Sequence, residues 1–248
     1  MKITVPSQVQ KTGKDNNVPP LIRLGSDEPY YFEQIKALRA KLETLIDAKH
    51  LKIVAVTSAI AGEGKTLSSA NLAVNLASAG RRRVLLVDMD LRKSEIGQGM
   101  GVKPTPGLSE FIGGTVTLKD ILRDTFVPGL QLIPAGKKVA DPTDLLAGER
   151  LRVFLGHARQ RYDIVLLDTP PILPVADTLS LRDQIDGFLF LFRAGFTPHH
   201  MLGQALEEVG EDKIIGVVLN GVEPKGDRYY HRYYGNYYNT SAKEETPE

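Results

Sequence analysis

The stretch 58–66 (SAIAGEGKT) combines the residue types that hold polyphosphates. It follows an apolar run at 51–57 and precedes an Ala- and Leu-rich segment at 67–79, which predicts a buried strand that turns into a helix. A glycine-rich turn of this kind aims successive backbone N–H groups into one concavity, at the positive end of the helix dipole. The pattern predicts a phosphate-binding loop of the G-x4-G-K-[ST] type, although Ala59 stands where the first glycine is usual.

The loop residues have distinct predicted roles. Gly62 and Gly64 permit close approach of the backbone to phosphate. Lys65 is expected to reach the β- and γ-phosphates, and the Thr66 hydroxyl to ligate Mg²⁺. Asn220 ends another apolar run and is a candidate to read the adenine ring; a turn-forming asparagine is the alternative. The residues expected to bind the nucleotide are therefore Ala61, Gly62, Glu63, Gly64, Lys65, Thr66, Leu67 and Asn220.

Carboxylates end two further apolar runs. Asp88 and Asp90 follow the run at 84–87, and Asp168 follows the run at 164–167. Such runs are typical of strands buried on both faces of a parallel sheet, and open α/β sheets bind ligands at the carboxyl ends of their strands. In strand geometry Asp88 and Asp90 point to the same side, so one ligand can engage both. Beside a phosphate loop we expect metal binding and catalysis, and a solvated strand end is the alternative.

Strand and helix patterns alternate along residues 51–220. This order predicts an α/β fold, with a doubly wound, mainly parallel sheet and helices on both faces, as in the P-loop NTPases. A helix is expected over about 29–48, and its polar residues Glu33, Lys36 and Arg39 are spaced for local ion pairing. Further elements are expected as strands at 130–133, 186–193 and 213–220 and as a helix at 149–161.

The composition divides the chain into three parts. Residues 1–25 are polar and contain proline, which predicts a mobile arm, whereas 26–225 form the predicted domain and 226–248 a flexible tail. The tail contains six of the nine tyrosines, and no apolar residue stands between them to carry them into a core. These tyrosines are Tyr229, Tyr230, Tyr233, Tyr234, Tyr237 and Tyr238.

Composition also excludes several classes of protein. A hydrophobic fraction of 42% in 248 residues is ample for a core, and the absence of cysteine excludes a disulfide scaffold or a thiolate metal site. The formal net charge of +1 argues against nucleic acid as a partner. No apolar run approaches the roughly 18 residues of a membrane span, and the first residues lack a secretory signal, so we expect a cytoplasmic chain.

Four features, in this order, resemble the bacterial protein tyrosine kinases of capsule and exopolysaccharide export. They are the phosphate loop, the run 84–92 (VLLVDMDLR), the run 164–171 (IVLLDTPP) and the terminal tyrosine cluster. The segments 132–136 (LIPAG) and 142–146 (PTDLL) resemble further stretches of that family. The resemblance extends over nearly all of 28–238.

The resemblance implies ATP and Mg²⁺ as cofactors, with transfer of the γ-phosphoryl group to the terminal tyrosines of a neighbouring subunit. By position, Lys65, Asp88 and Asp90 are implied to be catalytic. The implied metal ligands are Thr66, Asp90 and Asp168. Asp88 is implied to accept the tyrosine proton, although a phenol pKa of about 10 and a carboxylate pKa of about 4 are poorly matched. A loose transition state makes this mismatch less important, because positioning and charge neutralisation then supply most of the catalysis.

The family also forms rings of subunits through an E-x2-R-x2-R helix. Glu33 and Arg39 match this pattern, whereas Lys36 replaces the middle arginine and cannot make its bidentate contact, so we expect a weaker ring. Ser94 stands where the family usually has proline. The resemblance further implies a separate transmembrane activator, or polysaccharide co-polymerase, that recruits the chain to the inner face of the membrane, and a cognate tyrosine phosphatase.

A partitioning or division-positioning ATPase is the main alternative, in which ATP controls dimerisation and no protein is modified. Such proteins share the phosphate loop and the Asp-terminated strands. They usually carry an additional lysine near the start of the loop, where this chain has 58–60 (SAI), and they lack a tyrosine tail. A catalytically inert interaction protein is a third reading, which the retained loop lysine and carboxylates disfavour.

Overall fold

The computed structural model describes residues 19, 21–22 and 29–222. Most of the predicted arm at 1–25 and the whole of the predicted tail at 226–248, with its six tyrosines, lie outside the described residues. The division of the chain into arm, domain and tail therefore stays a prediction. The phosphate loop and all three carboxylates lie within the described part.

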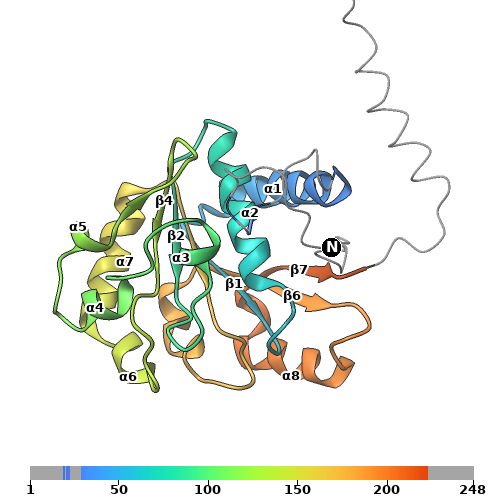
Figure 1. Ribbon diagram of the computed structural model, residues 1–248. Coiled ribbons are helices and arrows are strands. Elements are labelled where there is room, and N and C mark those ends of the chain that lie inside the picture. The colour runs from blue at the N-terminus through green and yellow to red at the C-terminus, as the bar shows by residue number, and fades with distance from the viewer. Residues whose placement is uncertain (1–18, 20, 23–28, 223–248) are drawn as a thin grey trace, which may run out of the picture.

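One sheet with the strand order β3-β4-β2-β5-β1-β6-β7 organises the domain (Figure 1). Every neighbouring pair is parallel except β3 with β4. This topology confirms the predicted doubly wound, mainly parallel α/β fold. The strands are β1 (Ile53–Ser58), β2 (Val84–Asp88), β3 (Arg123–Asp124), β4 (Leu130–Ile133), β5 (Ile164–Asp168), β6 (Gly187–Arg193) and β7 (Ile214–Asn220).

Helices cover both faces of the sheet, with α1 and α2 on one face and α7 and α8 on the other (Figure 1). Among the described residues, no helix is both long enough and apolar enough to cross a membrane. The helices are α1 (Pro29–Lys49), α2 (Lys65–Ser78), α3 (Ile96–Gly99), α4 (Leu108–Ile112), α5 (Leu118–Ile121), α6 (Thr143–Leu146), α7 (Glu149–Arg161) and α8 (His199–Val209), with the 3-10 turns η1 (Leu179–Gln184) and η2 (Glu211–Lys213).

Strand side chains alternate between two hydrophobic cores. In β1, Val54 and Val56 belong to the core beneath α1 and α2, whereas Ile53 and Ala55 belong to the core beneath α7 and α8. Because both faces of the sheet are covered, an alternating polar face would be buried without partners. This is why the inner strands are nearly continuous apolar runs, with polar side chains confined to their ends.

Most predicted elements are confirmed, and one strand is new. Strand β4 and helix α7 have the expected bounds, and α1 ends one residue later than expected. The short strand β3 was not expected, because Arg123 and Asp124 are polar and form no apolar run. Its antiparallel pairing with Gln131 and Leu132 of β4 is a contact between segments, which local periodicity does not report.

Asp186 joins three elements at the amino edge of the sheet. Its Oδ2 accepts hydrogen bonds from the backbone N–H groups of Lys52, at 2.7 Å, and Ile53, at 2.8 Å. The Arg159 guanidinium of α7 donates to the same carboxylate, with Nη1 at 2.9 Å from Oδ2 and Nη2 at 2.8 Å from Oδ1. Burial alone raises the pKa of Asp186, but these hydrogen bonds and the Arg159 charge outweigh it and hold the pKa below its usual range.

We expect Asp186→Asn to lower the free energy of unfolding at pH 7 by about 1–3 kcal/mol, because it removes a charge-assisted pair and disturbs two backbone contacts. A carboxyl with a lowered folded pKa stabilises the protein above its unfolded pKa, and this stabilisation is lost as pH falls through the folded value. The difference between wild type and variant in urea denaturation should therefore shrink from pH 7 to pH 3. An equal difference at both pH values would contradict this account.

Candidate nucleotide-binding site

The phosphate loop has a backbone that glycine alone accommodates. Gly62 and Gly64 have φ values of 84° and 90°. A Cβ atom at Gly64 would lie 2.1 Å from Nδ2 of Asn220, so a side chain there would collide. Gly64 is the N-cap of α2, and no side chain caps this helix in the described structure. The first backbone N–H groups of α2 are therefore able to donate hydrogen bonds to a ligand. An anion such as a nucleotide phosphate can accept them.

Hydrogen bonds to Glu63 stabilise the conformation of the loop. Its side chain is fully buried, and its carboxylate accepts hydrogen bonds from Ile60 N at 2.7 Å and Arg193 N at 3.3 Å, and one from the Thr197 hydroxyl. The Glu63 carbonyl accepts a hydrogen bond from Asn220 Nδ2 at 2.7 Å. The carboxyl ends of β6 and β7, together with Thr197, thus hold the loop in its conformation. The structure places Asn220 against the loop, and its role in reading adenine stays a prediction.

Asp88 and Asp168 lie side by side at the carboxyl ends of β2 and β5. They are paired in the parallel register of these strands, and both are almost completely buried. Asp168 Oδ1 accepts a hydrogen bond from Ser69 Oγ at 2.9 Å, and the Thr66 hydroxyl also bonds to this carboxylate. Ser69 carries no predicted role, although its place three residues after Thr66 on one helical face is a signal in the sequence.

Strand β2 ends at Asp88; Met89 N still donates to the Asp168 carbonyl at 2.8 Å, and the backbone turns at Asp90. Strand alternation therefore does not place Asp90, and the expectation that both side chains point to one side because of strand geometry is wrong in its premise. Instead, Asp90 N donates to Asp88 Oδ1 at 3.1 Å. The other Asp88 oxygen accepts from Ser94 Oγ at 2.8 Å and from Ile96 N at 3.4 Å. Ser94, which stands where the resemblance leads us to expect proline, thus contributes a hydrogen bond to the Asp88 carboxylate.

Burial dominates the electrostatics of the site. It raises the pKa of Asp88 well above its usual range, and the neighbouring charge of Asp168 adds to this effect. It also raises the pKa of Asp90, and it raises the pKa of Asp168 to about 6. For Lys65, burial lowers the pKa even though Asp168 and Asp90 attract the ammonium group. An incoming polyphosphate would supply further negative charge at Lys65 and favour its protonated form.

The predicted metal ligands Thr66, Asp90 and Asp168 do not form a complete site by themselves. In the described part of the chain, no cluster of three or more His, Cys, Asp or Glu side chains could hold a metal ion. Mg²⁺ usually binds one or two carboxylates together with substrate phosphates and water. Two carboxylates and a hydroxyl beside a phosphate loop fit that donor set, with the nucleotide completing it.

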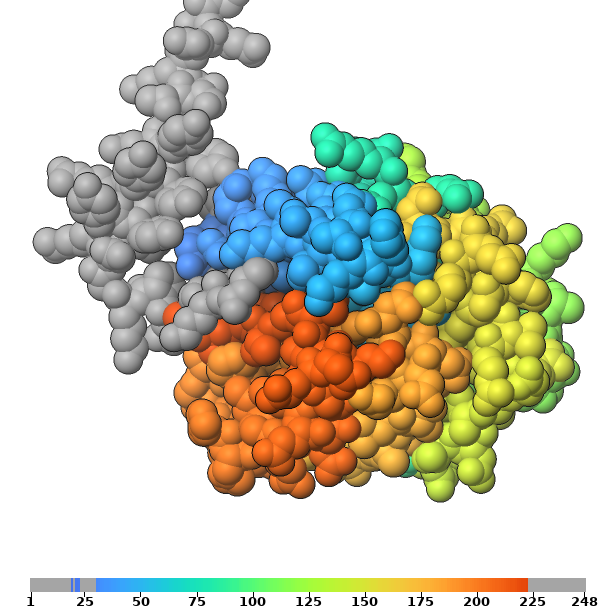
Figure 2. Space-filling model, turned by 180° about the vertical axis from the view of Figure 1, so that it is seen from behind, coloured from blue at the N-terminus to red at the C-terminus, as the bar shows by residue number. Residues whose placement is uncertain are grey.

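The three residues predicted for ring formation lie on α1, which forms part of the molecular surface next to β7 (Figure 2). Lys36 Nζ pairs with Glu33 Oε1 at 2.8 Å, which is the local ion pairing that the spacing predicts. Arg39 Nη1 donates to the Asn75 carbonyl of α2 at 3.4 Å. Their role between subunits stays a prediction.

Comparisons with known proteins identify the relatives of the chain. A family model described as an AAA domain matches residues 51–184. The chain is 33% identical to the putative tyrosine-protein kinase EpsB of Ralstonia solanacearum, over 92% of this chain and 31% of EpsB. It is 33% identical to the tyrosine-protein kinase CpsD of Streptococcus agalactiae, over 83% of this chain and 89% of CpsD. The chain belongs to the bacterial tyrosine-protein kinase family.

The solved structures agree with this membership. The kinase domain of the Escherichia coli tyrosine kinase ETK superimposes with a TM-score of 0.79 at 27% identity, over 91% of both chains. The chain spans 31% of the length of EpsB, so it corresponds to one portion of that longer relative. Membership of this kinase family implies nucleotide binding, and the residues that contact the nucleotide stay a prediction.

We expect Asp168→Asn to raise the free energy of unfolding of the ligand-free protein at pH 8 by on the order of 1–3 kcal/mol, because it removes one of two adjacent buried charges. The folded pKa of about 6 lies above the usual value of 3.8, so the wild type takes up a proton and gains stability as pH falls from 8 towards 5. The gap between wild type and variant in urea denaturation should therefore narrow at pH 5.

Asp183→Asn is the matched control, since this side chain is 98% exposed and its substitution should leave stability unchanged at both pH values. If Asp168→Asn were less stable than wild type at pH 8, the Asp168 charge would not be a source of instability, and the argument from burial would be wrong.

Proposed function

We propose that this chain is an ATP-dependent protein tyrosine autokinase, which transfers the γ-phosphoryl group of Mg-ATP to tyrosines in the 229–238 segment of a neighbouring subunit. The observation that carries the proposal is the meeting of Lys65, Thr66, Asp90 and Asp168 at the uncapped start of α2. Family membership and the six terminal tyrosines support tyrosine as the acceptor.

The proposed roles follow from the geometry. The N–H groups at the start of α2 and the Lys65 ammonium bind the phosphates. Thr66, Asp90 and Asp168 would hold Mg²⁺, which when bound neutralises phosphate charge. The tyrosine oxygen bonds to the γ-phosphorus as the bond to the ADP oxygen breaks, and Asp88 accepts the phenolic proton. Its raised pKa, caused by burial, narrows the gap to the phenol pKa.

The proposed setting is a homo-oligomer that regulates exopolysaccharide or capsule synthesis or export. The partly exposed side chains of Glu33, Lys36 and Arg39 on α1 are proposed to contact the next subunit in a ring. A separate transmembrane activator, or co-polymerase, would recruit the cytoplasmic chain to the membrane, and a cognate tyrosine phosphatase would reverse the modification. Nucleic acid is not a proposed partner.

Incubation with Mg-ATP and an activator fragment, followed by mass spectrometry of peptides from 227–248, tests the proposal. We expect phosphorylation of several of the six tyrosines in the wild type, and a fall to background for Lys65→Met, because the phosphate contact is lost. Asp183→Asn should behave as the wild type. Phosphate release with ATP-dependent dimerisation and no phosphotyrosine would instead support an ATPase switch of the partitioning type.

A further inference from the structure

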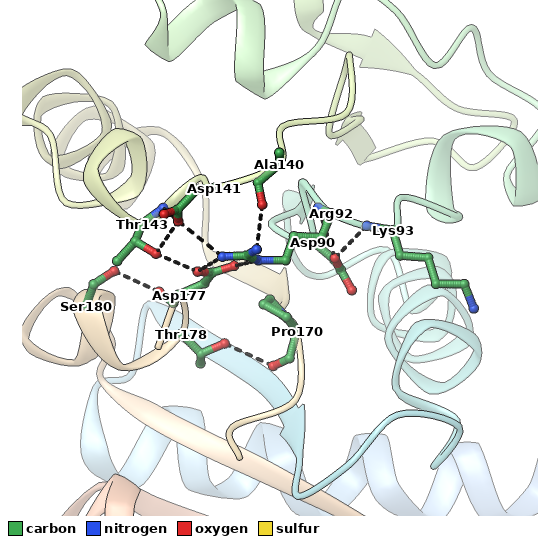
Figure 3. A network of polar contacts seen from close by, with 10 residues as sticks. All are labelled: Asp90, Arg92, Lys93, Ala140, Asp141, Thr143, Pro170, Asp177, Thr178 and Ser180. Carbon is green, nitrogen blue, oxygen red and sulfur yellow. Dashed lines mark hydrogen bonds and ion pairs between the residues drawn. The ribbon is translucent and has the colours of Figure 1, made fainter. Parts of the chain in front are cut away.

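The Arg92 side chain lies where the segments that follow three adjacent strands meet (Figure 3). Its Nε and Nη2 donate to the two carboxylate oxygens of Asp177, at 2.7 Å and 3.0 Å. Its Nη1 donates to the Ala140 carbonyl at 2.6 Å. Arg92 follows β2, Asp177 follows β5 and Ala140 follows β4, so one guanidinium joins all three segments at the carboxyl edge of the sheet.

Asp177 is a fixed anchor for this contact. Its side chain is almost completely buried, and its Oδ1 also accepts a hydrogen bond from the Thr143 hydroxyl at 3.0 Å. The next residue, Thr178, donates through its hydroxyl to the Pro170 carbonyl at 2.9 Å. Pro170 lies two residues after Asp168 and is also held from β1, by the Thr57 hydroxyl at 3.1 Å. Asp177 is therefore tied to the segment that begins at Asp168.

The backbone at Arg92 orients the Asp90 carboxylate. Arg92 N and Lys93 N donate to Asp90 Oδ1 at 3.2 Å and 2.8 Å, a turn that fixes the orientation of the Asp90 side chain. In the described structure no hydrogen bond is made to the second oxygen, Oδ2. The side chain of Arg92 is thus anchored through Asp177 to the Asp168 segment, while its backbone orients Asp90.

Stability alone is a weak explanation for this pair. Asp177 is buried, whereas the Arg92 side chain is 31% exposed, and the cost of removing the carboxylate from water cancels much of the attraction between the two charges. The contact with Asp177 uses the planar, two-pronged geometry of arginine, which lysine does not reproduce. Groups that orient metal ligands in this way commonly control metal affinity.

We propose that Arg92 and Asp177 form a positioning pair that sets Asp90 relative to Asp168 and thereby determines how strongly a divalent cation tightens nucleotide binding. This inference rests on the proposed function, because it assumes that the loop binds a nucleotide together with a cation. It assigns Arg92 no contact with the nucleotide itself.

The dissociation constant of a fluorescent ATP analogue, measured with Mg²⁺ and with EDTA, tests the pair. Their ratio is the factor by which Mg²⁺ tightens binding. We expect Arg92→Lys to reduce this factor roughly ten-fold or more, while affinity in EDTA stays within about two-fold of wild type. Arg159→Lys is the matched control, since it alters a second two-pronged Arg–Asp pair at the opposite edge of the sheet and should leave the factor unchanged.

Asp177→Asn should cause a similar loss, and the double variant should lose little more than either single variant, because both act through one contact. Thr143→Val removes the hydroxyl that bonds to Asp177 and to the exposed Asp141 but keeps the Arg92–Asp177 pair, so it serves as a mild variant if Asp177→Asn does not fold. It should give a smaller loss in the same factor.

If Arg92→Lys and Thr143→Val retain the wild-type factor, or if Arg92→Lys weakens binding equally in EDTA, the positioning role is wrong while the proposed kinase stands. If the wild type binds the analogue in neither condition, the proposed nucleotide site fails, and this inference fails with it.

Discussion

The parallel register between β2 and β5 sets Asp88 opposite Asp168, and the rest of the site depends on this pairing. Both carboxylates are withdrawn from water, which raises the pKa of each. An arrangement of this kind is unfavourable by itself, and it persists because the strands that carry it are embedded between two hydrophobic cores. The fold as a whole therefore holds the two carboxylates close together. A cation bound beside them would reduce the repulsion between their charges.

The sequence predicts the elements of the domain well, because each inner strand is an apolar run and each run ends in a chemically distinct residue. It predicts contacts between distant segments poorly. Arg92 and Asp177 are 85 positions apart, and neither lies in a local pattern that announces the other. The turn at Asp90 also escapes prediction, since nothing in the sequence pattern indicates that the strand ends at Asp88 and that the backbone turns two residues later.

The phosphate loop depends on a part of the chain that its own motif does not include. The AAA domain model matches residues 51–184, yet Arg193, Thr197 and Asn220 contribute the contacts that hold Glu63. Arg193 ends β6, Thr197 follows it and Asn220 ends β7, and these two strands lie on the side of β1 away from β5. The conformation of the loop therefore depends on strands beyond its own motif, and the buried Glu63 carboxylate links the loop to the end of β6.

Helix α2 begins at the phosphate loop and shares a hydrophobic core with α1. Arg39 of α1 reaches the Asn75 carbonyl on the last part of α2, so the two helices are joined by a polar contact as well as by packing. A close-packed core transmits displacement with little loss. The outer surface of α1 and the first N–H groups of α2 therefore belong to one packed unit, although the segments that carry them are separated by β1 in the sequence.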